Sequence, residues 1–389
     1  MPCWSTRADV APDPSISTEP FSPMDRRLPD NPSSYGTADM NLNCHQNEFG
    51  LYCWKRILVF KESSMPDLSV SYLGLKLGNP VIASSCGLTA TPEGVKRAFD
   101  AGAGAVVLKS LFEEQLRAEL KPIGEIQFSH PEAEAFLAGM GMNEGADEYL
   151  KLISAARKDG RGRVIASVNC VDGNFWMDFA KRMESAGAEA IELNLGYLPV
   201  DPSENGSEIE ERLETLVRSV ASAVKLPLAV KLGTAYTNIG NLIQRLGKAG
   251  VKAAVLFNRF YRMDVDLDAM SLSAGPTRGS PEAYFESLRW ISLLDGRTGV
   301  ELCASGGVYN GMTALKLIAA GASAVQVCSA VYAKGYGALT SIAKEMASWM
   351  DSRNVESIAD LQGRLARRNS ARPELYGRLH YVKALTGQS

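Results

Sequence analysis

From residue 66 onward, short apolar runs rich in β-branched residues alternate with longer segments in which apolar residues recur every three or four positions. The short runs predict buried strands, and the longer segments predict amphipathic helices. Eight short runs occur, at residues 80–85, 105–110, 164–170, 188–195, 227–233, 253–258, 301–305 and 324–329. This regular alternation of strand and helix predicts a parallel sheet.

The number of strand–helix pairs predicts a closed sheet. Eight pairs in about 265 residues match the size and order of a (β/α)8 TIM barrel, with a doubly wound open sheet as the alternative. Two longer segments, residues 111–145 and 259–280, follow the second and sixth strands. In a barrel both lie over the C-terminal rim of the strands, where active sites are built.

The two ends of the chain differ from this pattern. Residues 1–35 hold seven of the 18 prolines together with many Ser, Asp and Asn residues, a composition that predicts a disordered leader over 1–64. Because patterned sequence follows Met65 at once, we hypothesise that translation starts there and that residues 1–64 are not part of the native protein. The barrel is expected over 65–350, and a helical appendage rich in Arg and Leu over 351–389.

Composition excludes several classes of protein. The chain has 41 Lys and Arg against 44 Asp and Glu, a net charge of −3, which argues against nucleic-acid binding. No apolar run approaches the ~20 residues of a membrane span, and the N-terminus lacks the apolar core of a secretory signal. The seven cysteines form no CxxC pair, which favours free thiols in a reducing, cytoplasmic compartment and gives no iron–sulfur motif.

Polar residues gather at the ends of the predicted strands. In a barrel these ends meet on one rim, whereas the strand middles pack into the core. A strand-end Lys can also simply reach solvent, and an Asn can simply cap a helix. Because so many polar side chains are expected to meet at one end of the barrel, a functional site is favoured over these individual explanations. The residues are Ser84, Ser85, Cys86, Lys109, Ser110, Asn169, Cys170, Asn194, Lys231, Asn258, Ser305, Gly306, Gly307, Cys328 and Ser329. The three histidines lie elsewhere, so no metal site is expected.

The turn Ser305-Gly306-Gly307, followed by Asn310-Gly311 and a helix, suits an anion such as phosphate. Glycines let backbone amides approach phosphate oxygens, and a helix N-terminus adds its positive end. With Lys231 and Lys109 on the same rim, these residues suggest a phosphorylated planar cofactor. A lysine beside the N1/C2=O edge of a flavin stabilises its anionic reduced ring, and the amides of Asn169, Asn194 and Asn258 can bind heterocycle edges.

At these strand ends the sequence resembles the soluble, FMN-dependent class of the dihydroorotate dehydrogenase family. The resemblance covers residues 67 to about 345. It rests on Leu-Gly-Leu-Lys-Leu-Gly-Asn-Pro at 73–80, Lys109-Ser110, Glu-Leu-Asn-Leu at 192–195, Ala-Val-Lys-Leu at 229–232, Asn258, and Ser305-Gly306-Gly307 with Gly311. It implies oxidation of dihydroorotate to orotate in pyrimidine biosynthesis, a homodimer, and fumarate as a frequent electron acceptor.

The resemblance also implies roles for individual residues. The FMN ring and ribityl chain would be lined by Ser84, Ser85, Lys109, Ser110, Asn194 and Lys231, and the phosphate by Gly306, Gly307, Cys328 and Ser329. Lys109, Asn194 and Asn258 would also face the small-molecule substrate.

Several positions depart from the family pattern. After Glu-Leu-Asn-Leu the family continues Ser-Cys-Pro-Asn, with the Cys as base, whereas this chain has Tyr197 at the base position and Pro199 in place of the Asn. Tyr197 could act as a base only if a neighbour such as Lys109 or Arg259 lowered its pKa from about 10. Cys170 is the rival base, and Arg259 could bind a substrate carboxylate. Ala138 replaces a substrate-loop Asn.

Three other functions remain open at this stage. The changed substrate loop favours a flavin oxidoreductase of another unsaturated heterocycle. A phosphate-binding barrel lyase or aldolase would use Lys231 or Lys109 as a Schiff-base amine. The third alternative is a flavin-binding protein without turnover.

Overall fold

The computed structural model describes residues 65–113, 145–169, 173–259, 262–377, 381–382 and 386. The predicted leader over 1–64, most of the 111–145 segment with Ala138, and Cys170 lie outside the described residues.

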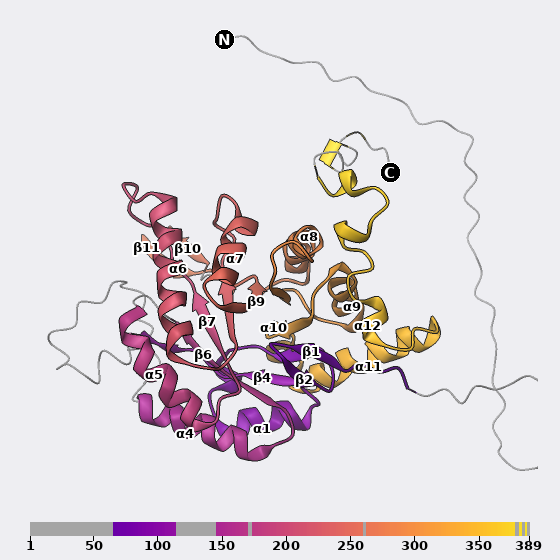
Figure 1. Cartoon of the computed structure of the whole chain (residues 1–389), viewed down its shortest axis with the longest axis horizontal. Coiled ribbons are helices and arrows are strands. Elements are labelled where there is room, and N and C mark those ends of the chain that lie inside the picture. The colour runs from indigo at the N-terminus through magenta and orange to yellow at the C-terminus, as the bar shows by residue number, and fades with distance from the viewer. Residues whose placement is uncertain are drawn as a thin grey trace, which may run out of the picture. The chain divides into compact units, whose positions relative to one another are not determined.

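A closed parallel barrel forms the body of the molecule (Figure 1). Its neighbouring strands follow the order β4-β3-β13-β12-β9-β8-β7-β6, and β4 pairs with β6 to close the ring. This closure confirms the TIM barrel and rules out the open sheet. All eight predicted strands are present: β3 (Val81–Ala83), β4 (Ala105–Val107), β6 (Arg163–Asn169), β7 (Ala190–Leu195), β8 (Leu228–Leu232), β9 (Val251–Leu256), β12 (Glu301–Ser305) and β13 (Ala324–Val327). A short strand, β5 (Leu111–Phe112), pairs with the end of β6.

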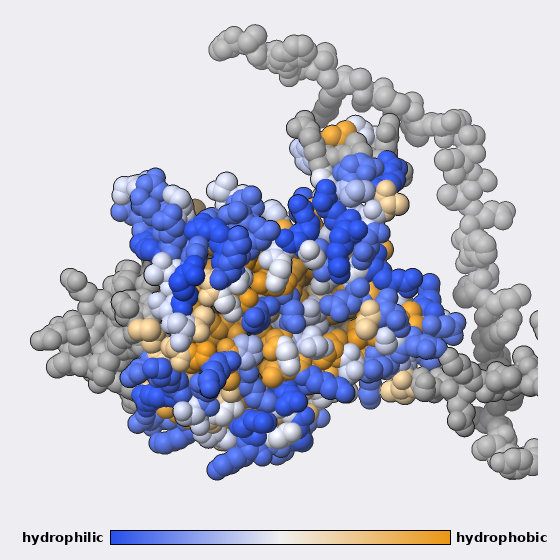
Figure 2. Space-filling model, viewed as in Figure 1, coloured by the Kyte–Doolittle hydropathy of each residue, from blue (hydrophilic) through white to orange (hydrophobic). Residues whose placement is uncertain are grey.

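Helices between the strands pack around the barrel: α1 (Pro92–Asp100), α4 (Ala146–Asp159), α5 (Gly173–Ala186), α6 (Gly206–Ala223), α7 (Ile239–Lys248), α8 (Tyr284–Leu294), α9 (Gly311–Ala320), α10 (Ser329–Lys334) and α11 (Gly337–Ser352). On α6 the spacing i, i+3, i+4, i+7 places Leu213, Leu216, Val217 and Val220 in the core. In the view of Figure 2 hydrophilic residues cover the helices at the edges, and hydrophobic residues show in the middle. None of the described helices is long and apolar enough to cross a membrane.

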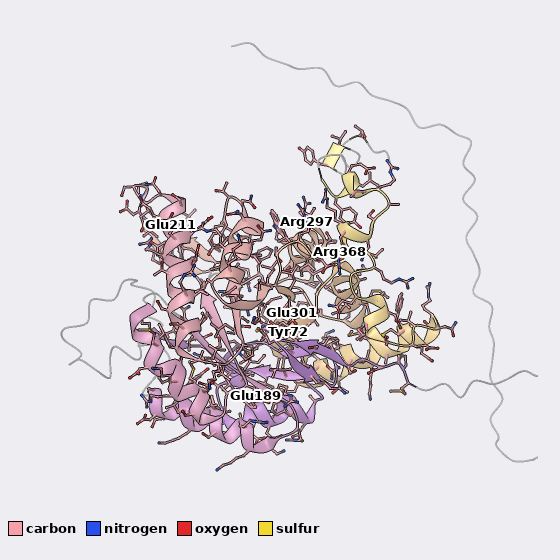
Figure 3. All side chains as sticks on the ribbon, in the orientation of Figure 1. Tyr72, Glu189, Glu211, Arg297, Glu301 and Arg368 are labelled. Atoms are coloured by element: carbon pink, nitrogen blue, oxygen red, sulfur yellow. The ribbon has the colours of Figure 1, made fainter. Side chains whose placement is uncertain are left out.

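An antiparallel hairpin of β1 (Val70–Tyr72) and β2 (Leu75–Leu77) plugs the end of the barrel at which the strands begin. Its Tyr72, Leu73 and Leu77 are buried against small interior residues such as Ala253. The Leu73 amide donates to the Glu301 carboxylate at the start of β12, at 2.6 Å, and Figure 3 shows Tyr72 and Glu301 together at this junction. Among the described residues, this hairpin covers the end where the strands begin and leaves the opposite rim, where the strands end, for a ligand.

Two further segments extend beyond the strands and helices of the barrel. The 259–280 segment, predicted as a loop, contains an exposed hairpin of β10 (Met263–Asp266) and β11 (Ser271–Ala274). Beyond α11 the chain forms the single turn α12 (Ile358–Leu361) and the 3₁₀ helices Arg367–Asn369 and Pro373–Tyr376. These short turns pack on α9 and α8, where the Leu365 amide donates to the Ala319 carbonyl (2.7 Å) and Arg368 pairs with Asp295 (2.6 Å).

Candidate active site

Strand register brings the predicted amides and one lysine into a row on the rim. Asn169 of β6 lies opposite Asn194 of β7, and Asn194 lies opposite Lys231 of β8. Asn258, just beyond β9, donates its side-chain N–H to Asn194 Oδ1 at 2.7 Å. These four residues therefore lie next to one another at the strand ends, as the strand-end pattern predicted.

Lys231 is buried within a polar network that crosses the barrel. Its Nζ donates to Gln326 Oε1 at 2.8 Å and to Ser84 Oγ at 3.1 Å, and only 7% of the residue is exposed. Gln326 in turn donates to Glu192 Oε2 at 2.5 Å. The other oxygen of Glu192 lies 3.8 Å from Lys231 Nζ and accepts no hydrogen bond. The lysine charge is thus compensated by a carboxylate that is itself only 1% exposed.

A second chain of hydroxyl groups links three neighbouring strands. The Ser85 hydroxyl accepts the Ser110 amide at 2.9 Å and lies 3.1 Å from the Ser110 hydroxyl, which is 2.8 Å from the Ser167 hydroxyl. Ser84 and Ser85 thus face different partners, with Ser84 in the lysine network and Ser85 in this one.

Three members of these networks were missed by the sequence reasoning: Glu192, Gln326 and Ser167. Successive side chains of a strand alternate between its faces, so a residue two positions before a strand-end polar residue shares its face. Glu192 precedes Asn194 in this way, and Ser167 precedes Asn169. The period-two rule applied inward from each strand end would have found them.

The glycine turn after β12 is partly explained by packing. Gly307 has φ +69°, and a Cβ there would lie 2.6 Å from the Pro281 carbonyl oxygen, so only glycine fits. Gly306 has φ +96°, but a Cβ there would meet nothing closer than 3.9 Å. Gly307 therefore serves the fold, whereas the backbone at Gly306 is open to a ligand.

The predicted contribution of the α9 N-terminus to an anion site needs correction. The Gly311 amide donates to the Glu345 carboxylate of α11 at 2.7 Å, and the Asn310 side chain caps the Thr313 amide at 2.8 Å. A carboxylate already occupies this positive helix end, which leaves less of it for phosphate. Beyond the neighbouring strand β13, the hydroxyl of Ser329, the first residue of α10, accepts the Gly279 amide at 3.0 Å, which ties the 259–280 segment to the rim.

Tyr197 does not meet the condition set for a base. Its hydroxyl donates to Glu204 Oε2 at 2.5 Å, and this bond to a carboxylate raises the tyrosine pKa above its ordinary value. Arg212, which pairs with the other Glu204 oxygen at 2.6 Å, lowers the pKa by less than Glu204 raises it, and neither Lys109 nor Arg259 is among the groups that shift it. The Tyr197 oxygen therefore keeps its proton, because its nearest charged acceptor is an anion.

The two remaining predicted residues, Lys109 and Arg259, differ in how far they are exposed. Lys109 is half-buried, with Nζ 5.6 Å from the centre of the Phe112 ring. Arg259 is exposed, and its guanidinium donates to the Thr277 carbonyl at 2.8 Å and to that of Pro276. These carbonyls belong to the same loop, so they position the arginine; its predicted pairing with a substrate carboxylate stays a prediction.

The closed barrel with polar strand ends at one rim defines the protein as a (β/α)8 barrel, with polar groups at the rim where enzymes of this fold build their active sites. The chain belongs to the dihydroorotate dehydrogenase family, whose model matches residues 67–350. The family consists of oxidoreductases, and membership implies a flavin cofactor and a small-molecule substrate.

Similar proteins share most of their length with this chain. The catalytic subunit of dihydroorotate dehydrogenase B (NAD(+)) from Thermoplasma acidophilum is 28% identical over 311 residues, which cover 77% of this chain and 99% of that protein. The protein of the same name from Methanocaldococcus jannaschii is 29% identical over 305 residues, with coverages of 74% and 95%. The similarity therefore extends over nearly the whole of both relatives.

Proposed function

We propose that this chain is an FMN-dependent dihydroorotate dehydrogenase-like oxidoreductase that converts dihydroorotate to orotate in pyrimidine biosynthesis. The buried Lys231 network beside the Asn194–Asn258 pair is the observation that carries the proposal. It places a fixed positive charge next to amide groups on the only rim of the barrel that the β1–β2 hairpin leaves open among the described residues.

The residues present fit a flavin phosphate ester. Lys231 offers a positive charge whose position is fixed by Ser84 and Gln326, which suits the N1/C2=O edge of the ring. The open backbone at Gly306 offers amides to the phosphate, with Gly307, Ser305, Cys328 and Ser329 around it. When bound, the flavin supplies the hydride acceptor for the reaction.

The substrate would be held by the remaining amides and by Lys109. Asn258 donates to Asn194 Oδ1, which fixes both amides and leaves the Asn194 N–H groups and the Asn258 carbonyl for a heterocycle. Asn169 continues this row on β6. Oxidation removes a hydride and a proton from neighbouring carbons. Because Tyr197 keeps its own proton, we assign proton acceptance to Cys170 and place Tyr197 in the pocket wall.

The lyase alternative is not favoured. A Schiff-base lysine must attack as a neutral amine with a free lone pair. The Lys231 nitrogen instead donates to two acceptors, Ser84 Oγ and Gln326 Oε1, and only 7% of the residue is exposed, so the amine is held inside the barrel and not presented to a substrate carbonyl.

The test is the visible spectrum of the purified protein, followed by anaerobic addition of dihydroorotate. Flavin absorbance that bleaches on addition supports both cofactor and substrate. Flavin that stays oxidised would reject dihydroorotate, and a colourless protein that FMN cannot reconstitute would reject the cofactor. A Lys231→Met variant is expected to lose the bleaching, whereas the exposed Lys252→Met, its matched control on β9, is expected to keep it.

The electron acceptor is tested with the same sample. The relatives named above are designated NAD(+) enzymes and catalytic subunits, whereas the soluble class that the sequence resembles often uses fumarate, and the sequence itself leaves the acceptor open. We propose fumarate as the acceptor of the isolated chain, so the bleached protein should regain colour on addition of fumarate but not of NAD+. We also propose a homodimer, which light scattering of the eluted protein would test.

A further inference from the structure

Two cysteines lie just beyond the ends of two neighbouring strands, at the open rim of the barrel. Cys86 lies three residues beyond the end of β3, and Cys328 directly follows β13. The strands pair in parallel, with Val327 opposite Ala83, and the Ser84 amide donates to the Val327 carbonyl at 3.0 Å. Neighbouring strands lie about 4.8 Å apart, and a disulfide joins Cα atoms about 5.5 Å apart. The register thus brings the two thiols to adjacent positions, and both are partly exposed and free.

Hydrogen-bond donors surround the Cys86 sulfur. The groups that stabilise its thiolate are the Cys328 thiol, the backbone amides of Leu88 and Thr89, and the Tyr332 hydroxyl. These bonds, the one from Cys328 first among them, lower the pKa of Cys86 to about 6. The same bond raises the pKa of Cys328, because that thiol keeps its proton to donate it.

The asymmetry gives the two thiols different chemistry. A thiolate is the nucleophile and is the form that oxidants attack, whereas a protonated neighbour serves as the resolving thiol. Cys303 provides a contrast inside the same barrel: it is fully buried, and burial raises its pKa well above the ordinary value. It should be inert under conditions in which Cys86 reacts.

We propose that Cys86 and Cys328 form a thiol pair that a hydroperoxide oxidises to a disulfide across the ends of β3 and β13. The Cys86 thiolate attacks one peroxide oxygen. An S–O bond forms, the O–O bond breaks, and the departing oxygen leaves as an alcohol or water after taking a proton. Cys328 then attacks the sulfenic sulfur, an S–S bond forms, and the oxygen leaves as water. The two thiols lose two electrons, which reduce the peroxide.

The bridge would constrain one residue of the Lys231 network and one residue that anchors the 259–280 segment. Ser84, two residues before Cys86, accepts a hydrogen bond from Lys231, and Ser329, next to Cys328, holds the Gly279 amide. Oxidation should therefore change flavin retention. This consequence rests on the proposed function, whereas formation of the disulfide does not.

Peptide mapping tests the pair directly. The reduced full-length protein is treated with hydrogen peroxide, alkylated with iodoacetamide and digested with trypsin without reductant. Alkylation is carried out after unfolding in urea, so that every remaining thiol, buried ones included, is labelled. Cleavage after lysines gives peptides 77–96 and 317–334, which contain Cys86 and Cys328 as their single cysteines. We expect the two peptides to appear disulfide-linked and to separate on addition of dithiothreitol. The peptide 298–316 contains Cys303, which is buried during the peroxide step; it should appear alkylated in the same digest and serves as the internal control.

Two variants separate the steps. Cys328→Ser removes the resolving thiol, so Cys86 should accumulate as a sulfenic acid that dimedone traps. Cys86→Ser removes the nucleophile, so Cys328 should stay reduced. The proposal is overturned if Cys86 of the unaltered protein stays fully alkylated after peroxide treatment, or if it links to a cysteine other than Cys328. If the disulfide forms but flavin absorbance is retained equally by both redox forms, the thiol pair stands and its effect on the cofactor is refuted.

Discussion

Replacement of Lys231 by Met is expected to destabilise the fold, because it leaves the buried carboxylate of Glu192 without a positively charged partner. Lys231 Nζ lies 3.8 Å from Glu192 Oε1, and the two residues are 7% and 1% exposed. At an effective dielectric constant of about 20, two unit charges at that distance attract by about 4 kcal/mol. Removal of one partner of a buried pair costs about 3–5 kcal/mol, because the other charge stays buried without compensation.

The assay is urea unfolding at pH 7, followed by tryptophan fluorescence, with and without added FMN so that loss of cofactor is not counted as loss of stability. Lys231→Met should lower the free energy of unfolding by about 3–5 kcal/mol, whereas the exposed Lys252→Met should change it by less than about 0.5 kcal/mol. A Glu192→Gln change added to Lys231→Met removes the stranded carboxylate and should recover at least half of the loss.

The reasoning is refuted by either of two results. A Lys231→Met cost below about 1 kcal/mol would mean that Glu192 is not a stranded charge in the folded protein. A double variant no more stable than the single one would locate the loss in packing or in the hydrogen bonds to Ser84 and Gln326.

Three further predictions concern the rim. Tyr197→Phe should keep kcat for dihydroorotate within about threefold, because Tyr197 donates to Glu204, whereas loss of a general base costs about 100-fold or more. Gly307→Ala should lower the unfolding free energy by about 1–3 kcal/mol in a denaturant titration, because its Cβ would collide with the backbone at Tyr284. Carboxymethylation of Cys86 should rise as pH increases through about 6, where the thiolate forms, and a midpoint near 9 would contradict the lowered pKa.

The fold could be predicted because each strand can be recognised from its own short stretch of sequence. The runs around β8 and β9 are apolar and bounded by turns, and their alternation with helical segments leaves few topologies. The row from Asn169 to Lys231 followed from the same logic, since parallel strand ends must meet. These features depend only on local pattern and on the closure of the sheet.

The partners of the site residues could not be predicted in the same way. Glu345 reaches the Gly311 amide from a helix 34 residues away, and no local pattern distinguishes it from a solvent-exposed glutamate. The hydrogen bond from Tyr197 to Glu204 depends on how one loop folds back on itself. Side-chain pairing across loops and helices is set by tertiary packing, and for that reason the sign of the Tyr197 pKa shift became clear only from the structure.

The contact between the two ends of the described fold sets the limits of a stable fragment. Asp67 bridges Ser357, and its carbonyl accepts the Ile358 amide at 2.8 Å. The family match stops at residue 350, so a protein trimmed to it would lose this bridge. The trimmed form would also leave the Ile318 and Ala319 carbonyls without the amides of Gly363 and Leu365. An expression boundary should therefore lie beyond residue 366.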